Sequence, residues 1–487
     1  MNTYSPFEES RFETKHEITI NGKRIPFCAV AEDFVFCGAS GAPEASLFSY
    51  SYTKCVETAE KDRPVIFVWN GGPGCSGAVE NLRFFSPWRV KNQAGSKFAP
   101  ITPPYELEAN PNCILDICDV VIIDPVGTGF GRLLKDDAGG YYSVDGDAKA
   151  TALFIESWLT ANERWNSPRY LAGTSYGSIR CARTLEALQG GAFQKNGIQR
   201  SIPVNGVVIV GAGLFINENA TSMLPEGVEP TLLLMRSMAA IHAYHEGREA
   251  EASAIADEAA NWGRSALQPY YENGGSDEEK RTLAEKMSAY TGLPVEVLLA
   301  SDLKVSSAEM FAAMVLATEG KDVGIYDARM TLPQSGAIGV PDPAGDDPGM
   351  GVYTAALTGV MNGAMREKMG ITDKRRFVYQ NYVANFGWNY AFPPTVVSEV
   401  SEIPARTHIQ CLAAAMRRNP RMQVLLATGL YDLCTWAGTN RYAAENCGLP
   451  AEQLTLKEYP GGHMAFSDFD VGTRFAADIC DLIRRTK

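Results

Sequence analysis

The chain begins with two segments in which apolar and polar residues alternate on either side of an Asn-Gly pair. Residues 16–20 and 23–36 have the periodicity of strands. The pair Asn21-Gly22 favours the positive φ angles of a tight hairpin turn. An antiparallel hairpin is therefore predicted at the start of the chain.

Short apolar runs recur further along and alternate with segments of helical periodicity. A helix is predicted from Asp147 to the residues before Asn166-Ser167-Pro168, with others over 179–188 and 472–485. Alternation of buried strands with helices is typical of an α/β protein with a mostly parallel central sheet. The predicted buried strands are 64–69, 119–124, 169–173, 204–210, 424–427 and 454–459.

Between residues 217 and 386 the pattern changes to alanine-, glutamate- and methionine-rich helical stretches, such as 249–264 and 277–290. Because strands precede and follow this block, it is interpreted as an insertion into the sheet domain. The predicted division is a first part of the core at 1–216, a helical cap at 217–386 and a second part of the core at 387–487.

The composition excludes several classes of protein. The 487 residues are 45% apolar and 21% charged, which is typical of a globular enzyme with a large core. The net charge is −13 and the basic residues are scattered, so nucleic acid is excluded as a partner. The longest apolar stretch, 204–216, falls short of the roughly 18 residues of a membrane span.

The first residues and the cysteines predict the cellular compartment in which the protein works. Residues 1–15 are rich in charge and lack the apolar core of a signal peptide. The eleven cysteines are an odd number, and Cys113 and Cys118 have no second pair to complete a zinc site. We therefore expect a cytoplasmic protein with reduced thiols and no metal or cofactor. The sequence carries no signal for the oligomeric state.

Gly173-Thr174-Ser175-Tyr176-Gly177 is the one G-x-S-x-G sequence in the chain, and it lies between a predicted strand and a predicted helix. The strained turn of a nucleophile elbow brings flanking backbone too close for side chains, so small residues are needed two positions before and after the serine. Ser175 is therefore a candidate nucleophile. It needs an imidazole to take its proton and a carboxylate to orient that imidazole.

Among the five histidines, His463 is in the best position to be this base. It follows a predicted strand in a glycine loop near the C-terminus, whereas His16, His242, His245 and His408 precede the sheet or lie in helical segments. Asp432 follows the strand 424–427, so both residues are expected at the carboxyl edge of the sheet, where catalytic groups gather. By contrast, Asp145 and Asp147 are interpreted as N-terminal helix caps.

The glycine-rich exit of the strand 64–69 supplies backbone N–H groups for a developing oxyanion, together with the N–H of Tyr176. With this segment the candidate motifs number five. They are Trp69-Asn70-Gly71-Gly72-Pro73-Gly74-Cys75-Ser76, Asp124-Pro125-Val126-Gly127-Thr128-Gly129-Phe130, Gly173-Thr174-Ser175-Tyr176-Gly177, Gly429-Leu430-Tyr431-Asp432 and Gly461-Gly462-His463-Met464.

In order and content these motifs resemble those of the serine carboxypeptidase family, peptidase family S10, and are closest to its bacterial branch. The resemblance implies an α/β-hydrolase fold with a helical cap and removal of C-terminal residues from peptides through an acyl-enzyme. A peptide or a small acyl compound is the implied substrate. The implied roles are Ser175 as nucleophile, His463 as base and then acid, Asp432 as its orienting group, Gly72 and Tyr176 as oxyanion donors, and Asn70, Gly71 and Thr174 as substrate-binding residues.

One departure from the family concerns the substrate's carboxylate. Family members have Glu at the position of Thr174 and a second Glu that aligns with Phe84. Thr174 can donate a hydrogen bond but cannot titrate, so the sequence predicts no acidic optimum imposed at that position. Glu80 lies close enough in sequence to be a substitute.

The departure leaves alternatives open. An esterase or acyltransferase on the same scaffold is the second interpretation, because Thr174 replaces the carboxylate-binding Glu. A catalytically silent binding protein is the third, although an intact set of Ser175, Asp432 and His463 disfavours it.

Overall fold

The computed structural model describes residues 9–55, 61–92, 101–135, 140–190, 198–334, 342, 344–398 and 401–486. Its centre is a sheet of ten strands in the order β1-β2-β3-β7-β4-β9-β10-β15-β16, with β8 paired to β3. The strands are β1 (Arg11–Ile20), β2 (Lys23–Cys37), β3 (Pro43–Lys54), β4 (Val65–Trp69), β7 (Asp119–Asp124), β8 (Arg132–Leu133), β9 (Arg169–Thr174), β10 (Gly206–Val210), β15 (Gln423–Gly429) and β16 (Leu454–Tyr459).

The pairing confirms the predicted strands and their directions. β1 and β2 form the antiparallel hairpin, with Ile20 opposite Lys23 and positive φ angles at Asn21 and Gly22. The six strands from β7 to β16 are parallel to their neighbours. Strand β3, which the sequence did not predict, joins the hairpin to this parallel part and is antiparallel to β7.

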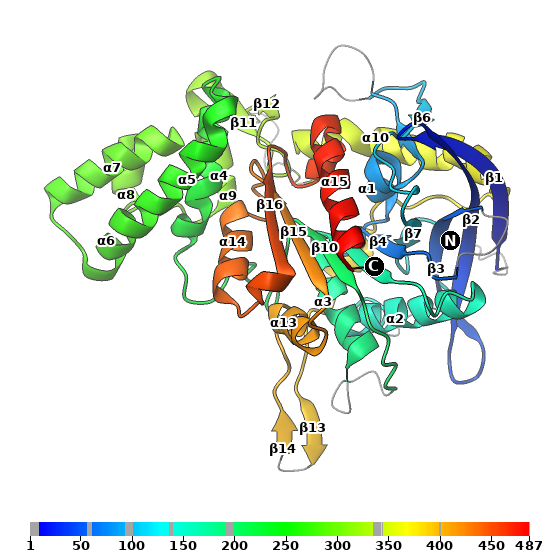
Figure 1. The fold of residues 1–487 in the computed structure, drawn as a ribbon. Coiled ribbons are helices and arrows are strands. Elements are labelled where there is room, and N and C mark those ends of the chain that lie inside the picture. The colour runs from blue at the N-terminus through cyan, green and yellow to red at the C-terminus, as the bar shows by residue number, and fades with distance from the viewer. Residues whose placement is uncertain are drawn as a thin grey trace.

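Helices cover both faces of the sheet (Figure 1). One face packs against α2, α3 and α13, and the opposite face packs against α15, the α1 region and α10. Residues such as Phe67 and Ile66 therefore point into different cores, which explains why most positions of the central strands are apolar. These helices are α1 (Ala78–Glu80), continued as a π-helical turn at Asn81–Phe85, α2 (Val144–Ala161), α3 (Tyr176–Gln189), α10 (Pro348–Asn362), α13 (His408–Arg418) and α15 (Phe469–Thr486). Helix α14 (Ala437–Asn446) lies between β15 and β16 in sequence.

Helices also dominate the segment between β10 and β15, and many of them form a separate body beside the sheet (Figure 1). Their own apolar cluster includes Leu234, Met238 and Ala284, and residues flanking Asp432 pack into it. The boundaries at 216 and 386 stay a prediction. The helices are α4 (Pro230–His245), α5 (Ala252–Trp262), α6 (Gln268–Asn273), α7 (Asp277–Thr291), α8 (Val295–Ala300), α9 (Ala308–Met314), α10 (Pro348–Asn362), α11 (Ala364–Met369) and α12 (Tyr382–Phe386).

Short two-stranded sheets complete the described part of the chain. They are formed by β5 (Trp88–Val90) with β6 (Leu107–Ala109), β11 (Lys321–Val323) with β12 (Thr331–Pro333), and β13 (Thr395–Ser398) with β14 (Ser401–Ile403). No helix in the described residues combines the length and apolar content that crossing a bilayer requires.

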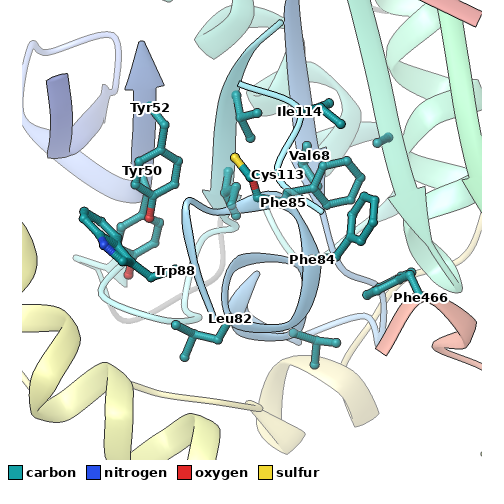
Figure 2. Packing of buried hydrophobic residues seen from close by; sticks show 14 of the residues in the cluster. Tyr50, Tyr52, Val68, Leu82, Phe84, Phe85, Trp88, Cys113, Ile114 and Phe466 are labelled. Atoms are coloured by element: carbon teal, nitrogen blue, oxygen red, sulfur yellow. The ribbon is translucent and has the colours of Figure 1, made fainter. Parts of the chain in front are cut away.

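A dense apolar core lies beneath the segment that follows β4. Phe84 is fully buried, and its ring centroid lies 5.7 Å from that of Phe466 and 4.9 Å from that of Phe475. Figure 2 shows Phe84 and Phe466 close together within this core. The position that aligns with the family's second glutamate is therefore an apolar packing position in this protein.

Candidate active site

The candidate residues come from the carboxyl ends of neighbouring parallel strands. Asn70 follows β4, Ser175 follows β9, Asp432 follows β15 and His463 follows β16. Because the carboxyl ends of parallel strands lie at one edge of a sheet, residues far apart in sequence meet there.

Ser175 lies on a strained turn between β9 and α3. Its φ and ψ angles are 59° and −127°, a region that residues other than glycine rarely adopt. A Cβ atom at Gly173 would lie 2.2 Å from the carbonyl oxygen of Gly177, so this turn requires glycine. Ser175 is half-buried, whereas Thr174 and Tyr176 on either side of it are buried. Ser175 is therefore the accessible residue of the turn.

Asp432 and His463 form a buried hydrogen-bonded pair. Nδ1 of His463 lies 2.8 Å from Oδ2 of Asp432, and the two residues are 3% and 0% exposed. The backbone N–H groups of Cys434 and Thr435 donate to Oδ1 of Asp432 at 2.7 and 2.9 Å. These bonds fix the carboxylate and hold the imidazole in one orientation, with Nε2 left to face a reacting group.

The end of β10 connects the serine turn to this pair. The N–H of Ser175 donates to the carbonyl of Val210 at 2.9 Å. A Cβ atom on the next residue, Gly211, would lie 3.1 Å from both Cε1 and Nδ1 of His463. Ser175 and His463 therefore both lie against Val210-Gly211, and the glycine allows the imidazole ring to approach.

Two further contacts position His463. The hydroxyl of Thr435 donates to Oδ2 of Asp432 at 2.6 Å and lies 3.2 Å from Nδ1 of His463. The N–H of His463 donates to the carbonyl of Tyr326 at 2.6 Å, and the Tyr326 ring packs edge-on against the imidazole at 5.4 Å. Tyr326 belongs to the segment between β10 and β15, so the insertion contributes directly to this geometry. Sequence analysis found neither contact.

The remaining four histidines lie on other elements. His16 is on β1, His242 and His245 are on α4, and His408 begins α13 and accepts a hydrogen bond from Arg183. In the described part of the chain no three His, Cys, Asp or Glu side chains are arranged to hold a metal ion.

The loop after β4 contains the predicted oxyanion and substrate-binding residues. Gly72 has a φ of 105°, and a Cβ atom at Gly71 would lie 2.6 Å from the Tyr176 nitrogen, so the loop packs directly on the serine turn. Tyr176 is the first residue of α3, where an N–H has no partner within the helix. The N–H of Gly71 donates to the Asn70 side chain at 2.7 Å.

A buried arginine that sequence analysis missed supports this loop. Arg180 on α3 is 1% exposed; its Nη1 donates to the Asn70 carbonyl at 2.6 Å and its Nε to Asp147 at 2.8 Å. The interpretation of Asp147 as a helix cap was therefore wrong, because Ser143 caps α2 and Asp147 is the buried partner of Arg180. An arginine among apolar residues on a predicted buried helix was the available signal.

Glu80 is a buried carboxyl group beside the serine turn. It is 0% exposed, and among the described residues neither carboxylate oxygen has a hydrogen bond of standard geometry. Burial raises the pKa of Glu80 to about 7, although the Thr174 hydroxyl and the charges of Arg180 and His463 oppose the rise. The family's acid is thus absent at Phe84, yet an acid one helical turn earlier lies near Thr174.

Comparison with known families agrees with this geometry. A model of the serine carboxypeptidase family matches residues 35–314. The chain belongs to the serine carboxypeptidase family. Its assignment to the bacterial branch of that family stays a prediction.

Individual relatives match parts of this chain. It is 30% identical over 178 residues to the pheromone-processing carboxypeptidase kex1 of Sclerotinia sclerotiorum, a match that covers 36% of this chain and 26% of that protein. It is 33% identical over 139 residues to serine carboxypeptidase-like 50 of Arabidopsis thaliana, covering 28% of this chain and 29% of the relative. The matched regions thus span less than a third of these relatives.

The fold is shared over almost the whole chain. The crystal structure of Kex1(delta)p, a prohormone-processing carboxypeptidase from Saccharomyces cerevisiae, superposes with a TM-score of 0.55 at 14% identity and covers 93% of this chain and 91% of that one. The expected α/β-hydrolase fold is confirmed.

Proposed function

We propose that this protein removes the C-terminal residue from peptides through an acyl-enzyme formed on Ser175. The observation that carries the proposal is the buried pair of Asp432 and His463, joined at 2.8 Å at the sheet edge where Ser175 occupies its strained turn. A serine hydroxyl becomes a nucleophile when an oriented imidazole takes its proton.

In the proposed reaction, Oγ of Ser175 attacks the scissile carbonyl carbon and its proton moves to Nε2 of His463. Asp432 stabilises the imidazolium, and the N–H groups of Gly72 and Tyr176 donate to the oxyanion. The C–N bond then breaks, and His463 returns the proton to the departing amine. Water attacks the acyl-enzyme by the same route, which releases the shortened peptide and regenerates Ser175.

We further propose that protonated Glu80 binds the terminal carboxylate of the substrate, together with Asn70 and Thr174. A buried carboxyl with a pKa of about 7 is neutral below that pH and can donate a hydrogen bond to a carboxylate. Gly71 shapes this loop, since its own N–H is bound to the Asn70 side chain. Glu80 thus favours peptidase activity over the second candidate, an esterase or acyltransferase, for which Thr174 at the family's Glu position is the supporting observation.

Two measurements test the proposal. A fluorophosphonate probe is expected to label the wild-type protein and to fail with Ser175→Ala, and absence of labelling of folded wild-type protein would support a silent binding protein. N-blocked dipeptides are then compared with their C-terminal amides and with p-nitrophenyl esters. Faster cleavage of the free acids supports a carboxypeptidase, whereas ester cleavage without any peptide cleavage would establish the second candidate.

A further inference from the structure

Helix α12 presents an exposed apolar surface. Phe386 is 85% exposed, Val383 80% and Tyr382 42%. Because large apolar side chains rarely gather on a protein surface without a binding role, this helix is a candidate binding surface. Three of the ten large apolar side chains that are exposed in the described part of the chain lie on this one five-residue helix. The rings of Tyr382 and Phe386 stack with centroids 5.7 Å apart and planes inclined by 26°.

The same helix is fixed to the loop that holds the oxyanion donor Gly72. The N–H of Asn381 donates to the carbonyl of Gly74 at 2.8 Å, and Nδ2 of Asn385 donates to the carbonyl of Pro73 at 2.8 Å. A Cβ atom at Gly74 would lie 2.6 Å from the Asn381 carbonyl oxygen, so glycine is required for this contact. The apolar surface therefore has a fixed position relative to the loop that carries Gly72.

Tyr382 lies at the end of the surface nearest the loop after β4, because Gln380, two residues before it, pairs with Cys75 in an isolated antiparallel bridge. Burial and the neighbouring Cys75 thiol raise the pKa of Tyr382. Burial raises the pKa of the Cys75 thiol, and the charge of Glu80 raises it further. The surface thus begins beside the loop that carries Gly72 and extends outward to Phe386.

We propose that Tyr382 and Phe386 bind the side chain of the C-terminal residue that is removed, so that peptides ending in a large apolar residue are preferred. The inference rests on the proposed function and specifies its substrate class. With the terminal carboxylate at Asn70 and Glu80, the departing residue lies on the Cys75 side of the scissile bond, and α12 is fixed to that side. An apolar side chain there covers rings that otherwise face water.

The test compares N-blocked dipeptides that differ only in a C-terminal Phe, Leu, Ala or Lys. Wild-type protein is expected to cleave the Phe substrate with a kcat/KM at least about tenfold above that for Ala, mainly through KM. In the double variant Tyr382→Ala/Phe386→Ala this ratio is expected to fall to within about twofold. Phe386→Glu is expected to shift the preference toward Lys.

The matched control is Val396→Ala on β13, which removes an apolar side chain that is 73% exposed on another element and is expected to leave the ratio unchanged. Thermal unfolding checks that each variant folds. An unchanged ratio in the double variant overturns this inference alone. It is likewise overturned if α12 instead joins two copies of the chain, seen as a dimer that the double variant dissociates without a change in substrate preference. Failure to cleave any dipeptide overturns the proposed function and the inference together.

Discussion

The carboxyl group of Glu80 gives the sharpest prediction, because its protonation state controls the site proposed for the substrate's carboxylate. With a pKa of about 7, roughly nine tenths of the protein carries protonated Glu80 at pH 6 and roughly one tenth at pH 8. If only the protonated form binds a carboxylate, the apparent dissociation constant of a peptide rises about tenfold between these pH values.

The assay isolates this effect from the titration of the catalytic base. The kcat/KM of an N-blocked dipeptide is divided at each pH by that of the corresponding ester, which lacks a free carboxylate but uses the same Ser175 and His463. In wild-type protein the ratio is expected to fall about tenfold from pH 6 to pH 8. In Glu80→Gln, which keeps the size and a hydrogen-bond donor, the ratio is expected to be independent of pH.

A matched control and a stability measurement accompany this assay. Glu218→Gln removes an exposed carboxylate and is expected to keep the wild-type profile. Because burial raises the folded-state pKa of Glu80, the folded state holds its proton more tightly than the unfolded chain does. The free energy of unfolding therefore falls as the pH rises from about 4.5 to 7, by about 3 kcal/mol, and Glu80→Gln lacks this loss. A flat ratio in wild-type protein, or an undiminished fall in Glu80→Gln, would refute the reasoning.

Three further changes test the site and its support. Ser175→Ala is expected to lower kcat by about four to six orders of magnitude, measured on the p-nitrophenyl ester. Thr435→Val removes the 2.6 Å bond to Asp432, so kcat is expected to fall about tenfold at unchanged KM; an unchanged kcat would show that this hydroxyl does not position the pair. Arg180→Met leaves Asp147 buried without its arginine partner. The free energy of unfolding, measured with denaturant at pH 7, is expected to fall by about 3–5 kcal/mol, and a value equal to that of the wild type would contradict this.

The sequence was sufficient to predict the strands that carry the chemistry, for a physical reason. The central ones are short apolar runs because both faces of the parallel strands are covered, and glycine or Ser175 follows within two residues of the ends of β4, β9 and β16. Strand β3 escaped prediction because serines interrupt its apolar pattern. Ser46, Ser49 and Ser51 are nevertheless buried, since neighbouring strands and helices enclose β3 on both sides, and an isolated strand pattern does not contain that information.

The buried charges could not be predicted in the same way. Glu80 and Arg180 lie on helices, where charged residues usually face water, and local periodicity does not reveal what covers them. Each is enclosed by segments distant in sequence, as when Arg180 on α3 reaches Asp147 on α2 and the Asn70 loop. The family spacing indicated Phe84 for the second acid, while the carboxyl lies at Glu80, four residues earlier. Proximity in sequence named Glu80 as a substitute, but the burial of its carboxyl could be seen only in the structure.

The helical insertion is more closely tied to catalysis than its composition indicates. The N–H of Leu433 donates to the carbonyl of Ile325, the N–H of Ala328 to that of Tyr431, and the N–H of His463 to that of Tyr326. One short segment of the insertion thus binds the backbone of both loops that carry the acid and the base. The two loops also bind each other directly, because the N–H of Tyr431 donates to the carbonyl of Gly461 at 3.0 Å. The insertion segment adds a second connection between them. The insertion is therefore part of the framework that aligns the proposed catalytic pair, in addition to any role as a cover.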